Sequence, residues 1–137
     1  VFMYFAQVGF SAAVKDCQPV NAEQAGTIII TPFYTYINTT TNSLSISNGV
    51  ASCSSYLWAS QVDKVEIRSN LQRYQDGSLS TIATFTESVN SSIVSLSETY
   101  RVTSGYSYRL VTTYNVYIGD VLRETTSDTY NYGYYGG

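Results

Sequence analysis

The sequence predicts an all-β fold, an antiparallel sandwich of about seven strands. Apolar and polar residues alternate at period two along several segments, and no stretch keeps the 3.6-residue period of an amphipathic helix. Turn residues separate these segments at intervals of about ten to fourteen residues. Only 12% of the 137 residues are charged, so Ser and Thr supply much of the polar surface. These residues suit exposed strand faces, and the length fits a single domain with its own core.

The chain begins with its most apolar segment, residues 1–14, followed by a polar linker over residues 15–26. If the segment is extended, its apolar side chains fall on one side, which predicts an arm that acts as a strand. Small residues at positions 11–13 also suit the end of a signal peptide, and a short buried helix is a third interpretation. Whether the segment is a strand or a leader stays open at this point. The residues on the apolar side of the extended arm are Phe2, Tyr4, Ala6, Val8 and Phe10.

The sandwich domain is expected over residues 27–132, with a first strand interrupted at Pro32, because proline cannot donate to a ladder. The clearest local signal follows at Asn48-Gly49, which supplies the two positive-φ positions of a type I′ hairpin turn. The hairpin register that keeps the apolar side chains on one face pairs Ser47 with Val50, Ile46 with Ala51 and Leu44 with Cys53.

The rest of the domain consists of a second hairpin and three further strands. Asp76-Gly77 is the turn of this hairpin, and Gly119-Asp120 precedes the last strand. The strand at residues 106–118 has the most regular alternation, with Thr112 as the one polar residue on its apolar side. Together these five strands are expected at residues 62–74, 78–89, 94–102, 106–118 and 121–132. A Tyr/Gly tail follows over residues 133–137.

Residues 96–114 resemble the strand, turn and strand corner of immunoglobulin-like domains, in which a Gly precedes a Tyr that locks the corner. In this chain Tyr108 stands three positions after Gly105 instead of two. The resemblance covers about a hundred residues by pattern and implies an immunoglobulin-like sandwich. More loosely, residues 43–53 and the β run after them look like small secreted proteins of unassigned role from Gram-positive bacteria. That likeness implies export and β structure but no activity.

The composition excludes the commonest catalytic machinery. The chain has no histidine, so Ser-His-Asp and Cys-His arrangements and His-containing zinc sites are impossible. Its ten acidic residues are scattered and are expected to be ordinary surface charge, not a glycosidase pair. A net charge of −3 without a basic stripe argues against nucleic acid, and no apolar run reaches the length of a membrane span. We therefore expect no catalytic residue, cofactor, metal or membrane span.

Two further features are candidates for a structural or contact role. Cys17 and Cys53 either form one disulfide, worth roughly 4 kcal/mol by loop entropy, or are separate buried thiols. The tyrosine-rich end of the chain is expected to lie beyond the last strand, where it packs on its own domain, contacts another subunit or forms a ligand platform. Its tyrosines are Tyr130, Tyr132, Tyr134 and Tyr135.

Two functions remain, and both place the protein outside the cell, secreted or at its surface. In the first, it is a non-enzymatic structural subunit whose arm adds as a strand to the sheet of a neighbouring copy. Such a head-to-tail contact does not close, so it builds a homopolymeric fibre. In the second, it is a monomeric secreted binding module that recognises glycan or protein through its loops and tyrosine tail. In that case residues 1–13 are a leader remnant.

Overall fold

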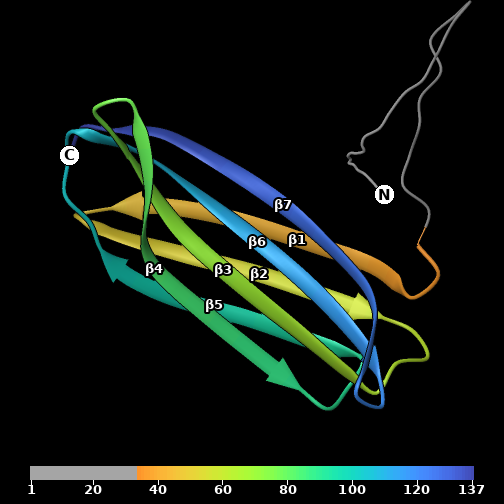
Figure 1. Cartoon of the computed structure of the whole chain (residues 1–137). Helices are drawn as coiled ribbons and strands as arrows, with labels where there is room; N and C mark the ends of the chain where they lie inside the picture. Colours follow the sequence, from red (N-terminus) through yellow and green to blue (C-terminus); the bar gives the residue numbers. More distant parts are fainter. Residues whose placement is uncertain (1–33) are drawn as a thin grey trace, which may run out of the picture. The chain divides into compact units, whose positions relative to one another are not determined.

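The structure is a computed structural model that describes residues 34–137. These residues form seven strands and no helix, so the all-β prediction is confirmed, and no helix among them could cross a membrane (Figure 1). The predicted arm, the polar linker and Pro32 lie outside the described residues. The strands are β1 (Ile37–Ser47), β2 (Val50–Ala59), β3 (Lys64–Gln75), β4 (Ser78–Val89), β5 (Ile93–Arg101), β6 (Tyr106–Ile118) and β7 (Val121–Tyr135).

The strands form two antiparallel sheets that lie one over the other (Figure 1). The smaller sheet has the order β1-β2-β5 and the larger has the order β4-β3-β6-β7. The chain thus returns to the smaller sheet once, when β5 pairs with β2 after the β3–β4 hairpin. The edge strands are β1 and β5 in the smaller sheet, and β4 and β7 in the larger sheet.

Both predicted hairpins are present. Asn48 and Gly49 have φ of 53° and 76°, and Asp76 and Gly77 have φ of 53° and 82°, as a type I′ turn requires. Gly supplies the second of these positions at no steric cost, and Asn and Asp tolerate the first. The predicted register of the first hairpin is confirmed in each pair, from Ser47 with Val50 to Leu44 with Cys53.

The core between the sheets consists of two apolar clusters, each with residues from both sheets. Because the buried residues alternate along β2, β3 and β6, one face of each sheet points inward. The first cluster includes Ile37, Leu57, Val65, Ile67, Val94, Leu96, Tyr114 and Val116. The second includes Leu44, Ile46, Cys53, Leu71, Val102, Tyr108, Leu110 and Tyr135.

A group of four polar side chains, which we call the polar belt, lies between the two clusters along the strands. Ser55, Ser69 and Thr112 are at most 3% exposed. Ser69 and Thr112 are hydrogen-bonded at 2.8 Å. Thr112 and Ser55 both donate to the side-chain oxygen of Asn42, at 2.8 and 3.0 Å. The Asn42 amide nitrogen donates to the backbone oxygens of Leu110 and Asp128, so the belt joins the two sheets.

The turn between β5 and β6 is fastened by one buried tyrosine. The Tyr108 hydroxyl donates to the backbone oxygen of Thr103 and accepts from its backbone N–H. The side chain is 2% exposed and packs in the second cluster. Tyr108 therefore ties the start of β6 to the chain five residues before it.

Candidate functional site

The four tyrosines of the predicted contact tail belong to β7, which runs to Tyr135 and so extends three residues past the expected last strand. Tyr135 is buried, and its hydroxyl accepts from the backbone N–H of Gly49. Tyr132 donates to the backbone oxygen of Ile46. Tyr130 and Tyr134 are 41% and 68% exposed. Two of the tyrosines thus hold the sandwich together, and two remain available for contacts.

Cys53, one of the two predicted disulfide residues, lies in the second cluster and is 1% exposed. Burial, and to a lesser extent the Glu98 carboxylate, raise the pKa of its thiol to about 11. Both effects disfavour the thiolate, which is the reactive form. Cys17 lies outside the described residues, so the disulfide remains a prediction.

We expect the Cys53 thiol of a Cys17→Ser variant to react with a disulfide reagent at about pH 8 more than a hundredfold more slowly in the folded protein than in denaturant. The raised pKa lowers the thiolate fraction, and burial blocks access. The measurement is the release of the chromophore over time. Unmodified protein, denatured without reductant, serves as the comparison because a Cys17–Cys53 bridge would leave it without a free thiol. Fast labelling of the folded variant would contradict the expected burial of Cys53.

Hydrogen bonds fasten the two sheets together along the side where β1 faces β7. The Glu124 carboxylate accepts from the backbone N–H groups of Thr35, Tyr36 and Ile37, at 2.6, 3.0 and 2.9 Å. A register shift between β6 and β7 lies beside Glu124. Three N–H donors on one carboxylate are a strong anchor, because hydrogen bonds to charged groups contribute more than neutral ones. This side of the sandwich is closed.

The opposite side, where β4 faces β5, has a different character. Its best-defined contact is between the rings of Phe85 and Tyr100, which meet edge to face with centroids 6.5 Å apart. Among residues 34–137, no side-chain hydrogen bond joins β4 to β5. In the strand register Glu87 lies opposite Ile67 and Glu98 lies opposite Cys53, which are both buried. The two glutamates therefore occupy positions on the inner face, yet their side chains are exposed. The β4/β5 side is therefore held by apolar contact and is open to water.

The edge strands β1 and β4 carry little of the charge that usually blocks pairing with another chain. β1 contains no charged residue in its eleven positions, and β4 contains only Glu87 in its twelve. Neither strand contains Lys or Pro. Natural edge strands are commonly protected by Lys, Pro, bulges or inward-pointing charges. Glu87 provides one such charge on β4, and each strand has one bulge, at Asn38 in β1 and at Ile82 in β4. The other residues of both strands are uncharged.

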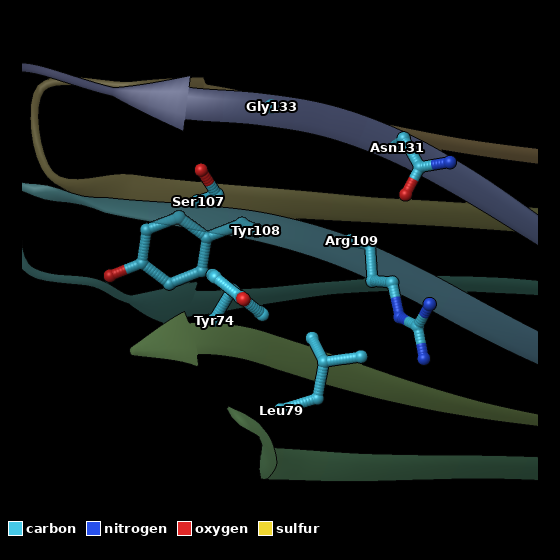
Figure 2. Close-up of a pocket in the computed structure, with 7 residues that line it drawn as sticks. All are labelled: Tyr74, Leu79, Ser107, Tyr108, Arg109, Asn131 and Gly133. Atoms are coloured by element: carbon cyan, nitrogen blue, oxygen red, sulfur yellow. The ribbon is translucent and has the colours of Figure 1, made fainter. Parts of the chain in front are cut away.

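A hollow of about 320 Å³ lies on the face of the larger sheet that points away from the smaller one; we call it the outer-face hollow (Figure 2). In the strand register Tyr74 lies between Leu79 and Ser107. Arg109 lies next to Asn131 on β7. The residues that line the hollow are Tyr74, Leu79, Ser107, Tyr108, Arg109, Asn131 and Gly133. None was predicted as a site, because the seven residues come from four strands that are separated in the sequence.

Comparison with known proteins found no matching family model, no similar curated protein and no similar solved structure. Within residues 34–137, no group of three or more His, Cys, Asp or Glu residues is placed to hold a metal ion. The described residues offer two kinds of surface for function: the nearly uncharged edge strands β1 and β4, and a hollow with a cationic side chain.

Proposed function

We propose that the protein is a non-enzymatic extracellular structural subunit that assembles into a fibre by strand addition. The apolar arm, residues 1–14, adds to an open sheet edge of the next copy. The observation that carries this proposal is the neutral character of the edges, since the eleven residues of β1 and the twelve of β4 contain one charge between them. An edge of this kind offers unpaired backbone groups with little charge to oppose pairing.

We favour β4 as the edge that receives the arm. The inner face of β4 carries apolar side chains that are only partly covered, Ile82, Phe85 and Val89. The arm has its apolar residues on one side when extended, so one strand would supply both backbone partners and apolar cover. The β1 edge is less suitable because Glu124 holds the chain just before and at its start.

The proposed fold type is an immunoglobulin-like sandwich, as the sequence resemblance implied. Two observations support it. The sheets have the orders β1-β2-β5 and β4-β3-β6-β7, with one return to the smaller sheet. The Tyr108 hydroxyl bonds back to the backbone of Thr103, which is the bonding pattern of a tyrosine corner.

Removing residues 1–14 is expected to abolish assembly and leave a folded monomer, because the proposed strand donor is lost while every described strand remains. Sedimentation velocity and electron microscopy measure assembly, and circular dichroism checks the fold. A second variant keeps the length of the arm and replaces Phe2, Tyr4, Val8 and Phe10 with serine, with the same expected result. Fibres formed by either variant would refute the proposal.

The choice of acceptor edge has its own matched pair of variants. Lysines at Ser80 and Thr86 on β4 are expected to slow assembly at least about tenfold, because charge on an edge opposes pairing. Lysines at Thr39 and Thr41 on β1 are the control and should leave the rate within about twofold. All four side chains are exposed. The reverse pattern would move the acceptor to β1.

A second candidate function is a monomeric secreted module that binds glycan or protein. The outer-face hollow favours it, since it brings apolar and polar side chains from four strands to one place. On this proposal the ligand surface lies on the sheet face, and the exposed ring of Tyr134 flanks it beside Ser107.

A further inference from the structure

We infer that the outer-face hollow binds a sugar that carries a carboxylate, with Arg109 as the carboxylate partner. The inference rests on the second candidate function and identifies the class of ligand for that site. It follows from the charge in the hollow, from the apolar side chains opposite that charge and from the space between them.

The Arg109 guanidinium has donors to spare. Its Nε donates to the side-chain oxygen of Gln72 at 2.8 Å, which fixes the plane of the group. In the described part of the chain this is the one hydrogen bond that the guanidinium makes, so its two terminal nitrogens face the hollow or solvent without an acceptor. Two such parallel donors match the two oxygens of a carboxylate. The chain has a net charge of −3, so the positive charge in the hollow also favours anionic ligands there over cationic ones.

The opposite side of the hollow is suited to the body of a sugar ring. Tyr74 and Leu79 are adjacent in the register and are 49% and 43% exposed, so they offer an apolar surface for the C–H face of a ring. Asn131 stands beside Arg109 and supplies an amide that can donate and accept, and Ser107 supplies a hydroxyl. A few fixed polar groups beside an apolar surface are typical of small-molecule sites.

The space in the hollow arises from an irregularity in β7. Asn131 lies opposite Arg109 and Tyr134 lies opposite Ser107, so four residues of β7 lie opposite three of β6. Gly133, with φ of 96°, lies within this bulge. The extra residue separates the side chains of Asn131 and Tyr134 on the outer face. The volume of about 320 Å³ is at the lower end of the range for small-molecule sites and suits one or two sugar units.

The test is calorimetric titration of the full chain with a galacturonic acid tetramer and with the matching neutral galactose tetramer. We expect the acidic sugar to bind at least about tenfold more tightly, and Arg109→Gln to remove this preference, since one charge-assisted contact accounts for a difference of that size. Tyr74→Ala should weaken both sugars. Arg68→Gln is the control, since Arg68 is exposed on β3 and outside the residues that line the hollow.

The outcomes separate this inference from the function on which it rests. Equal binding of the two sugars, lost in Tyr74→Ala, would refute the carboxylate and keep the binding module. No binding of either sugar would refute the inference, and intact assembly under the same conditions would then support the structural function. If Arg68→Gln removed the preference for the acidic sugar and Arg109→Gln kept it, the binding site would lie outside the outer-face hollow. Full displacement of the acidic sugar by an equal concentration of acetate would show that the hollow binds any small carboxylate. This result would also refute the inference.

Discussion

Replacing Asn42 with leucine is expected to lower the free energy of unfolding by about 3 kcal/mol or more. The Asn42 amide donates to two backbone oxygens and accepts from the hydroxyls of Ser55 and Thr112. Leucine has a similar size but no polar atom. It would leave two hydroxyls and two carbonyl groups short of a partner, each at a cost of about 1–3 kcal/mol if no water replaces it. Urea unfolding at constant m-value measures the loss, and a fall in Tm of about 12 °C or more should accompany it.

A matched control is Asn70→Leu, the same substitution on β3 at a position whose amide oxygen accepts from the exposed Thr84 hydroxyl. Its expected cost is below about 1 kcal/mol, because water can replace an exposed partner. A rescue variant combines Asn42→Leu with Ser55→Ala, Ser69→Ala and Thr112→Val and should regain part of the loss, since no hydroxyl of the polar belt is then left without a partner. If Asn42→Leu were as stable as the unmodified protein, the hydrogen bonds of Asn42 in the polar belt would contribute nothing to the free energy of unfolding.

The local features of the fold could be predicted from the sequence because each depends on a few neighbouring residues. The turn at Asn48-Gly49 and its register follow from two positive-φ residues between alternating segments. The strand at residues 106–118 follows from its period of two, and it is confirmed as β6. In the last strand the pattern predicts an end at residue 132, whereas pairing with β6 carries β7 on to Tyr135.

The features that depend on long-range pairing could not be predicted. Thr112 appears in the sequence as an exception in an apolar strand, and only its position opposite Ser69 and near Asn42 turns it into part of a hydrogen-bonded group. The outer-face hollow has the same origin, because Arg109 and Asn131 become neighbours through strand register. The bulge in β7 also changes which tail tyrosines face outward: it pairs Tyr134 with Ser107 and Tyr135 with Tyr106, so that Tyr134 is exposed and Tyr135 is buried. A uniform alternation along the tail does not show this.

Tyr114 is expected to make the domain less stable at alkaline pH. It is fully buried and its hydroxyl donates to the backbone oxygen of Thr41 at 2.9 Å. Burial, and secondarily the Asp128 carboxylate, raise the pKa of the phenol well above its ordinary value of about 10. The folded state thus keeps a proton that the unfolded chain loses. Its stabilising effect is complete below about pH 10 and falls above it by about 1.4 kcal/mol for each pH unit, while the folded phenol remains protonated.

Tyr114→Phe tests this because it removes the titrating group and keeps the ring. At about pH 8 the variant should be about 1 kcal/mol less stable than the unmodified protein, since the Thr41 oxygen loses its donor. Above about pH 11 the difference should reverse, because phenylalanine has no proton to lose. Tyr130→Phe is the control, at a position that is 41% exposed, and its stability should stay parallel to that of the unmodified protein. If the gap between Tyr114→Phe and the unmodified protein stays constant across this range, the Tyr114 phenol titrates alike in the folded and unfolded states, and burial does not hold its proton.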